Sequence, residues 1–469
     1  MPHVAERTSD LIGRLAGAAH LDGERLVVDD EAAIRGDVIR DLAWTAAFAT
    51  DDATIAAAQW LVREAARELG ALSASIHDLY VARSRGEVAG FTVPAINIRA
   101  QTFDMARTVY ETAAAADVGA VIVELARSEQ TYTFQRPADY ATSVLAGAIA
   151  AGWRGPVFIQ GDHYQFNAKK YATDPEAMTE EIRRACRLAI DAGYRNIDID
   201  SSTLVDLSKP NVDEEQRQNY LRAAELTALI RSLETDGVTV SVGGEIGEVG
   251  KENSNEAELV AYLDGYRAEL DRLAPGATGI SKVSVQTGTS HGGVPLPDGS
   301  VAAVKLDFEV LRRLGEVARS RGLAGAVQHG ASTLPDELFH RFPAVETAEI
   351  HLATGFQNAL YEHPAFPAEL HREIEAWCFE NALDERKPDQ TDQQFVYTTR
   401  KKAIGPFKRK LWDLATKDEI LAGQRRKIAF LFTELGVNGS RGMVDRYIRP
   451  VEQRTAAPEG IRQATRAAG

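Results

Sequence analysis

The sequence lacks the features that mark secreted and membrane proteins. Only two cysteines occur, Cys186 and Cys378, and they lie far apart in helix-like segments, so neither a disulfide framework nor a CxxC metal site can be written. No uninterrupted apolar run approaches the ~18 residues of a membrane span. The first residues carry scattered charges instead of the apolar centre of a signal peptide. We therefore expect a soluble, cytoplasmic protein that is not bound to a membrane.

The sequence also has no long basic tract. Its formal net charge is -15 at pH 7, which argues against binding to nucleic acid or anionic lipid through bulk electrostatics. The short basic stretch at 398–410 most simply forms a solvated face. Hydrophobic residues at 44% and charged residues at 26% are ordinary for a globular chain. A negatively charged substrate would need local positive groups.

What the sequence does contain is a regular alternation of short, β-branched apolar runs with longer amphipathic stretches. This alternation is typical of repeated βα units on a parallel sheet. The eight runs span residues 91–97, 118–125, 155–160, 196–200, 238–244, 280–285, 325–329 and 347–353. Eight evenly spaced units favour an α/β fold of the TIM (β/α)8 barrel type, with an open doubly wound sheet as the main alternative.

Helical segments flank the predicted barrel. Residues 1–72 have helical patterning without strands and are interpreted as a helical N-terminal extension, ahead of a barrel at 73–364. Residues 365–450 are again helix-like, and residues 451–469 are polar and are expected to form a flexible tail.

Polar residues follow four of the apolar runs, at the strand ends where a barrel of this kind places its active site. Asp162 and His163 end the third run, Glu245 the fifth, His291 the sixth and His329 the seventh. Three imidazoles and a carboxylate suit zinc or a similar first-row ion, and three protein ligands leave one position open for a substrate. A single histidine of this kind is more often structural, so the prediction depends on their convergence.

Glycines next to two of these histidines indicate a phosphate cradle. His291 is followed by Gly292, and His329 by Gly330, Ala331 and Ser332. Glycine lets backbone N–H groups approach an oxyanion closely, and the serine hydroxyl adds a donor. Tight βα turns are the structural alternative.

Across these residues the chain resembles the class II, metal-dependent fructose-bisphosphate aldolases, from about Ser75 to Phe407. The motifs occur in family order: PAIN at 94–97, PVFIQGDH at 156–163, DIDSS at 198–202, GGEIGEVG at 243–250, TSHGG at 289–293 and HGAS at 329–332. The resemblance implies a TIM barrel, in agreement with the strand count, and an enzyme of carbohydrate metabolism such as glycolysis.

The resemblance also implies roles for individual residues. It implies a catalytic zinc, or a similar divalent metal, on His163, His291 and His329, optionally with a monovalent cation nearby. Asp200 and Glu245 would hold a second or alternative metal position that is more buried. Asp162 would be the acid/base aspartate, and Glu252, in the polar loop after Glu245, would move protons at the nucleophilic carbon, with Glu248 of the same loop as the alternative. Substrate and phosphate binding would fall to Asn97, Gly292, Gly330, Ser332, His351, Thr354 and Arg400.

Arg400 implies more than one subunit. The family places such an arginine on the distal phosphate of a neighbouring subunit's substrate, so we expect a homo-oligomer of two or more chains. The expected partner is therefore a second copy of the chain together with a small sugar phosphate.

Several positions depart from the family pattern. Ala126 stands where a serine is usual, the lysine expected after TSHGG is missing, and His351 and Ala353 replace an asparagine and an acidic residue. These departures fall at positions expected to contact the substrate more than at the expected metal ligands. Fructose 1,6-bisphosphate is thus the leading substrate, beside tagatose bisphosphate and modified ketose 1-phosphates. A zinc-dependent TIM-barrel hydrolase and a non-catalytic barrel are the alternatives from other classes.

Overall fold

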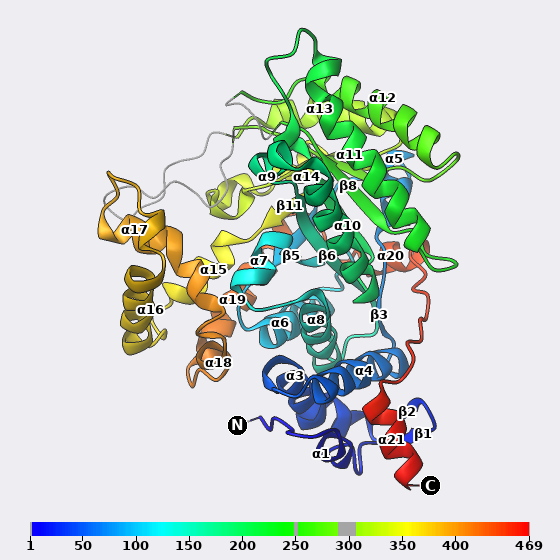
Figure 1. The fold of residues 1–469 in the computed structure, drawn as a ribbon, viewed down its shortest axis with the longest axis vertical. Coiled ribbons are helices and arrows are strands. Elements are labelled where there is room, and N and C mark those ends of the chain that lie inside the picture. The colour runs from blue at the N-terminus through cyan, green and yellow to red at the C-terminus, as the bar shows by residue number, and fades with distance from the viewer. Residues whose placement is uncertain (1, 248–251, 289–305, 469) are drawn as a thin grey trace.

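Eight parallel strands close into a barrel at the centre of the molecule. The structure is a computed structural model that describes residues 2–247, 252–288 and 306–468 (Figure 1). The barrel strands are β4 (Val93–Asn97), β5 (Ile122–Ala126), β6 (Gly155–Gln165), β7 (Asn196–Asp200), β8 (Ser241–Glu245), β9 (Lys282–Ser284), β10 (Ala326–Gln328) and β11 (Glu349–Leu352). Each pairs with its neighbour in sequence, and β11 pairs with β4. The TIM barrel is therefore confirmed, and each predicted run overlaps one strand, although β5, β6 and β8 extend past the ends of their runs.

Helices surround the barrel because each crossover must cover one apolar strand face. They are α6 (Thr102–Ala115), α7 (Arg127–Tyr132), α8 (Pro137–Ala150), α9 (Ala168–Thr173), α10 (Pro175–Asp191), α11 (Val212–Leu233), α12 (Glu256–Leu273), α13 (Phe308–Ser320), α14 (Arg341–Ala344) and α15 (Thr354–Tyr361), with short 3-10 turns at Ser202–Leu204, Ala331–Thr333 and Asp336–Leu338. Helix α10 illustrates how the sequence determines where such a helix begins and which face it buries. The Asp174 side chain caps it by accepting from the Ala177 amide, and Met178, Ile182 and Cys186 bury one face.

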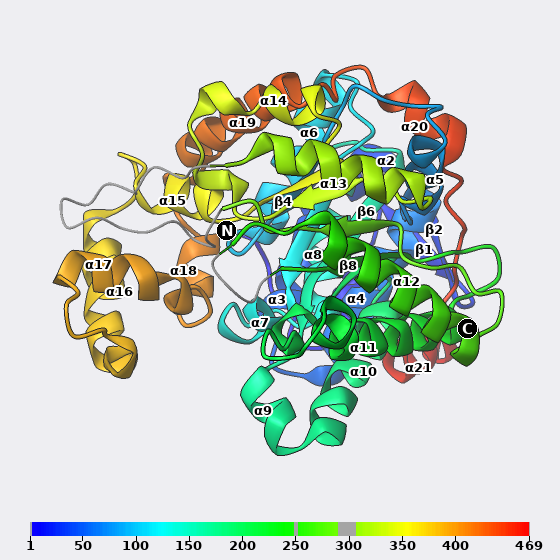
Figure 2. The same ribbon diagram turned by 90° about the horizontal axis from the view of Figure 1, so that it is seen from above.

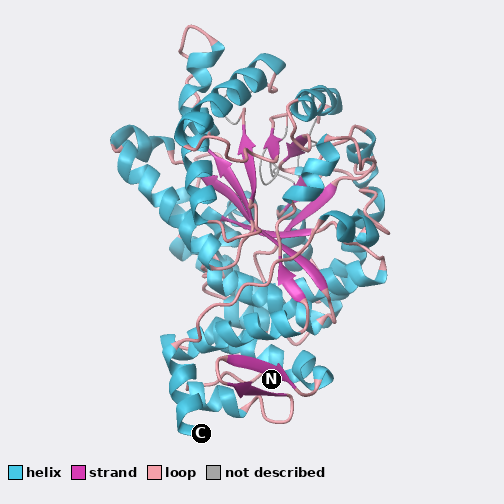
Figure 3. Ribbon diagram, turned by 90° about the vertical axis from the view of Figure 1, so that its right-hand side faces the viewer, coloured by secondary structure: helices cyan, strands magenta, loops and turns pink. Residues whose placement is uncertain are grey.

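The N-terminal extension packs on the outer helical layer of the barrel, mainly against α8 (Figure 3). It contains α1 (Thr8–Gly13), β1 (Ala19–Asp22), β2 (Arg25–Val28), α2 (Glu31–Ala33), a π-helical turn at Ile34–Val38, α3 (Ile39–Phe48), α4 (Asp52–Glu68), β3 (Ala71–Ser73) and α5 (His77–Ser84). The extension is mainly helical, as predicted, but the expectation that it has no strands is wrong. Strands β1 and β2 form an antiparallel hairpin, and β3 pairs with the start of β6.

The C-terminal region is helical and divides into two parts. It comprises α16 (Ala368–Asn381), a 3-10 turn at Leu383–Glu385, α17 (Asp392–Thr399), a 3-10 turn at Arg400–Ile404, α18 (Lys408–Trp412), α19 (Lys417–Glu434) and α20 (Arg441–Tyr447). Helices α16, α17 and α18 project from the side of the barrel, and buried residues such as Leu370 and Phe395 give this projection its own apolar cluster (Figures 1 and 2). Helix α19 returns to pack on α6 and α15.

The expected flexible tail is instead partly folded. Helix α21 (Glu459–Ala468) packs against α1 and α4 of the N-terminal extension, and Ile461 is fully buried there. The tail looked polar because a short amphipathic helix needs few apolar residues once a partner surface exists. None of the helices in the described ranges has the length and apolar content that a membrane crossing would need.

Candidate metal centre and substrate cavity

Two adjacent residues of β6, Asp162 and His163, both reach the same site because the strand is irregular there. Successive side chains of a regular strand point to opposite faces. Between Gly161 and Tyr164 the pairing of β6 with β7 shifts register, and His163 adopts a φ of 44°. This left-handed conformation costs a non-glycine residue about 1 kcal/mol or more, which points to a functional constraint. Gly161 is required as well, because a Cβ there would lie 2.4 Å from the Tyr164 ring.

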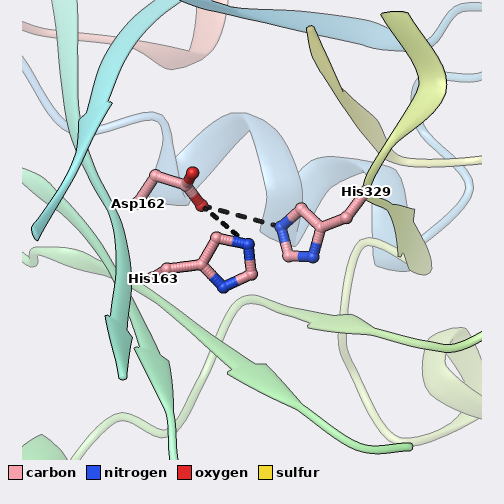
Figure 4. Close-up of side chains that lie close together, drawn as sticks. All are labelled: Asp162, His163 and His329. Atoms are coloured by element: carbon pink, nitrogen blue, oxygen red, sulfur yellow. Dashed lines mark ion pairs between the residues drawn. The ribbon is translucent and has the colours of Figure 1, made fainter. Parts of the chain in front are cut away.

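Strands β6 and β10 bring Asp162, His163 and His329 together (Figure 4). Asp162 Oδ1 lies 3.9 Å from His163 Nε2 and 3.6 Å from His329 Nε2, and the two imidazole rings are 4.3 Å apart between centroids. The candidate ligand atoms of the three residues all lie within 4.8 Å of one another. Residues from the third and seventh barrel strands therefore converge as predicted.

His163 belongs to a second cluster with Asp200 at the end of β7 and Glu245 at the end of β8. Its Nδ1 lies 3.0 Å from Asp200 Oδ2 and 3.5 Å from Glu245 Oε2, and these three residues also offer ligand atoms within 4.8 Å. His329 Nδ1 lies 3.5 Å from Glu245 Oε1, so the two clusters are continuous.

Asp200 is held as a carboxylate by the DIDSS motif. Ser202 Oγ donates to Asp200 Oδ1 at 2.7 Å, and Gln165 Nε2 donates to Oδ2 at 2.6 Å. Burial alone would raise the pKa of Asp200, but the contact with His163 and these donors outweigh it and lower the pKa. A carboxylate that stays ionised is a ready metal ligand.

The donor set fits a divalent cation. Burial lowers the pKa of His163, yet Asp162, Glu245 and Asp200 outweigh burial and hold that pKa well above its ordinary value. The site thus favours a positive charge where imidazole nitrogens and carboxylate oxygens converge, which suits zinc or a similar first-row ion.

His351 of β11 lies behind Asp162. Its Nδ1 is 3.3 Å from Asp162 Oδ1 and 3.1 Å from Glu124 Oε2, and its ring centroid is 4.1 Å from that of His329. Burial raises the pKa of Glu124 to about 8, against the opposing effect of His351. His351 is therefore enclosed by carboxylates and is in direct contact with the predicted acid/base residue.

A charged layer fills the barrel below His351. Lys282 Nζ lies 3.0 Å from Asp198 Oδ2, contacts Glu349 and donates to Gln160 Oε1 at 2.8 Å. Gln160 Nε2 in turn donates to Glu124 Oε2 at 2.9 Å and to Glu349 Oε1 at 2.8 Å. The hydrogen bonds link the layer to the residues around the candidate metal centre.

A cavity of about 310 Å³ opens beside the candidate metal centre. Asp162, His163, His329 and His351 reach it from one side, and the cations Arg99, Arg127 and Lys401 line it elsewhere. Arg99 and Arg127 are already paired, with Glu129 at 2.6 Å and Glu181 at 2.9 Å. Lys401 makes no ion pair within 4.0 Å in the described part of the chain. It is thus the cation best placed to meet an anionic substrate group.

Besides His351, four predicted substrate residues line this cavity. Gly330 has a φ of 69° at the turn after β10, which only glycine adopts without strain, and Ser332 and Thr354 follow on neighbouring elements. Asn97 Nδ2 donates to Glu129 Oε2 at 2.6 Å, while its buried Oδ1 has no hydrogen-bond partner among the described residues and can serve a ligand.

Two further predicted residues, Arg400 and Glu252, do not line the cavity. Arg400 is buried against its own chain, where Nη2 contacts Glu362 Oε1 at 2.6 Å and Asn358 Oδ1 at 2.8 Å. Glu252 is exposed and does not line the cavity. His291 and Gly292 lie outside the described residues, as does the segment after TSHGG that lacks the lysine usual in the family.

The comparisons with known proteins agree with this geometry. The family model for fructose-bisphosphate aldolase class II matches residues 83–410. The chain belongs to the class II fructose-bisphosphate aldolase family. This family typically depends on a divalent metal, and membership gives the chain an aldolase-type function.

Solved structures support the fold at low identity. A fructuronate-tagaturonate epimerase from Cohnella laeviribosi aligns with a TM-score of 0.55 at 11% identity, over 92% of this chain and 91% of that one. A protein described as a probable tagatose 6 phosphate kinase from Sinorhizobium meliloti aligns with a TM-score of 0.52 at 16% identity, over 80% of this chain and 98% of that one. This member of the aldolase family is therefore divergent.

Sequence reasoning missed Glu124, Arg99, Arg127 and Lys401. The signal for Glu124 was present, since it is the one acidic residue in the apolar run at 118–125. A carboxylate inside such a run faces either the lumen or a helix, and only the strand register decides which. Lys401 was passed over for its neighbour Arg400.

Proposed function

We propose that the protein is a divalent-metal-dependent aldolase that breaks or forms a carbon–carbon bond in a ketose phosphate. The observation that supports this most is the continuous set of His163, His329, Asp200 and Glu245 beside a cavity that also holds Asp162 and Lys401, a lysine with no ion pair among the described residues. When bound, a divalent metal would polarise the ketone and stabilise the negative charge that develops as the bond breaks.

Asp162 is the proposed acid/base group. Cleavage needs a base for the substrate hydroxyl proton, and the reverse reaction needs an acid to return it. Asp162 lies on the cavity wall among three imidazoles, with Oδ1 closest to His351 Nδ1 at 3.3 Å. His351 and Glu124 fix the carboxylate from behind, so that it can take the proton without moving away from the substrate.

The phosphate groups are assigned to the polar rim of the cavity. Lys401 supplies the charge, and Ser332, Thr354 and the backbone at Gly330 supply donors. Fructose 1,6-bisphosphate remains the leading substrate, and dihydroxyacetone phosphate and an aldehyde are the proposed products. Tagatose bisphosphate and modified ketose 1-phosphates share this recognition.

A homo-oligomer is also proposed, on the resemblance at Arg400. The Arg400 guanidinium forms an ion pair with Glu362, whose side chain is half exposed. The phosphate of a substrate bound to a second copy of the chain would therefore have to displace that carboxylate. Size-exclusion chromatography with light scattering tests the assembly.

The test of the function is a panel of ketose phosphates, with dihydroxyacetone phosphate detected by a coupled dehydrogenase. We expect triose phosphate release from at least one ketose bisphosphate. Hydrolysis of a nitrophenyl ester without any triose phosphate release would instead support a zinc hydrolase on this barrel.

A second candidate is epimerisation of a ketose or a related sugar acid. The observation that favours it is the extent of the likeness to the Cohnella epimerase, which covers 92% of this chain and therefore continues beyond the 83–410 match. An enzyme that breaks the carbon–carbon bond and re-forms it on the other face of the aldehyde carbonyl would invert one carbon stereocentre. It could use the same catalytic groups as an aldolase. Conversion of substrate to an isomer, with no triose released, would identify this reaction.

A further inference from the structure

A second, larger cavity lies away from the candidate metal centre. It encloses about 620 Å³, twice the volume beside the metal centre, and none of the residues at the metal centre lines it. Its walls are helix α4, strand β3, the end of α10, the segment before β8 and the C-terminal residues 451–455. Figure 1 shows that C-terminal segment passing from α20 along β3 toward α21.

Two arginines face this cavity without a carboxylate partner. Within the part of the chain that the structure describes, Arg63 makes one hydrogen bond, from Nη1 to the Asp191 carbonyl at 3.3 Å, and its buried Nε has no partner. Arg195 donates to the carbonyls of Ile190 at 3.0 Å and Tyr194 at 2.8 Å, and its Nη2 donates to the neutral side-chain oxygen of Gln453. Neither guanidinium has an ion pair within 4.0 Å in the ranges that the structure describes.

Burial destabilises the positive charge of both arginines while neither has a carboxylate partner in the described residues. It lowers the pKa of Arg63 and lowers that of Arg195 to about 10, because each positive charge is partly removed from water. Arg67, one turn along α4, shows the usual solution, since it is tied to Glu64 at 2.9 Å and Glu68 at 2.7 Å. An anion between Arg63 and Arg195 would provide the compensation that the chain omits.

The acidic groups at this cavity, Asp191 and Glu234, offset the effect of burial on the two arginines only in part. Asp191 is exposed and makes no ion pair with Arg63, and Glu234 is already paired with Arg231. Arg454, at the exposed rim, adds a third positive charge. The local balance is therefore positive in a chain whose net charge is -15.

The rest of the wall is largely apolar. Leu72, Leu145, Val238, Val240 and Val451 contribute to it, so a simple inorganic anion would leave most of the volume unused. We propose that this cavity binds a small organic anion, whose phosphate or carboxylate group lies between Arg63 and Arg195 and whose apolar body contacts these aliphatic side chains. Arg63 and residues 451–455 lie outside the family match at 83–410, so the site depends on both extensions of the chain.

Calorimetric titration of the full-length protein tests this site, with hexyl phosphate, hexanoate, inorganic phosphate and hexanol as probes. We expect hexyl phosphate or hexanoate to bind more tightly than either inorganic phosphate or hexanol, because the site has both a cationic and an apolar part. The comparison of the first two probes identifies which anionic group is preferred.

Three variants locate the binding. Arg63→Met keeps the length of the side chain and should weaken binding roughly tenfold or more, since a charge-assisted contact is lost. Arg446→Gln is the matched control, because it removes the same charge from an exposed position outside the cavity. Lys401→Met changes the other cavity and should leave this binding intact.

A cavity-filling variant keeps the test decisive if Arg63→Met does not fold. Val451→Trp places a large side chain in the C-terminal wall and should abolish binding while α21 and the barrel keep their far-ultraviolet circular dichroism. Equal binding by wild type and both cavity variants, loss of binding in Lys401→Met, or no binding of any probe to the wild type would overturn the proposal.

Discussion

Replacing Lys282 with methionine should strongly destabilise the barrel. Lys282 is 1% exposed and its ammonium lies among Asp198, Glu349 and Gln160. Methionine keeps most of the volume but removes the ammonium group, so the two buried carboxylates retain the His351 imidazole, at 2.9 Å from Glu349 and 3.7 Å from Asp198, and lose their closest full positive charge. Breaking a buried ion pair by removing one partner costs about 3–5 kcal/mol, far more than the pair itself contributes relative to a well-packed apolar core.

The same geometry predicts a rescue. Glu349→Gln in the Lys282→Met background removes one uncompensated charge, and Tyr80 and Gln160 can still hydrogen-bond the amide. We expect the double variant to recover at least about 1 kcal/mol, which is within the range of coupling between contacting residues.

The destabilisation should also depend on pH. Burial would raise the pKa of Glu349, but Lys282 and His351 outweigh it and hold the pKa below its ordinary value. The stability from this pair is present above the pKa of an unfolded glutamate and is lost as the pH falls below it. The gap between wild type and Lys282→Met should therefore narrow in acid.

Urea unfolding followed by circular dichroism and tryptophan fluorescence measures these differences. Lys209→Met is the matched control, because Lys209 is half exposed and pairs with Asp206 at the surface, so its midpoint should change little. A Lys282→Met midpoint equal to that of the control, or no rescue by Glu349→Gln, would refute the account of the buried layer.

Three further predictions concern other sites. Burial lowers the pKa of His77 from 6.5 to about 4, so the wild type should lose about 3 kcal/mol more stability than His77→Asn as the pH falls through this interval; parallel curves in urea would contradict it. Asp162→Asn should keep its metal but lose about a hundredfold or more in kcat, whereas His163→Ala should lose metal and rate together in elemental analysis and assay. Lys401→Met should raise KM for the phosphorylated substrate roughly tenfold, with little effect from Lys402→Met, and equal changes in both would remove Lys401 from the substrate site.

The barrel could be predicted because its signal is local. The runs around Ile122, Ile159 and Val242 are short and β-branched, and they recur with a helix between each pair. The site followed from the barrel, because parallel strands place their carboxyl ends at one edge. His163 and His329 were found in this way.

The parts that sequence missed depend on register and tertiary contact. The bulge that turns both Asp162 and His163 toward one site has no local signature beyond Gly161. Lys282 and Glu349 lie inside apolar runs, and only the closed barrel shows that each is the other's partner. Helix α21 was predicted as a flexible tail because its partners, α1 and α4, are more than 390 residues earlier in the chain.

Metal-dependent cleavage of a ketose bisphosphate is tested most directly by measuring triose phosphate release from one preparation in three states. These states are the protein as purified, after chelation and dialysis, and after zinc is added back. We expect about one divalent ion per chain in the first state, loss of both metal and activity in the second, and recovery of both in the third. Full activity in the metal-free protein, or borohydride trapping of the substrate on a lysine, would contradict it.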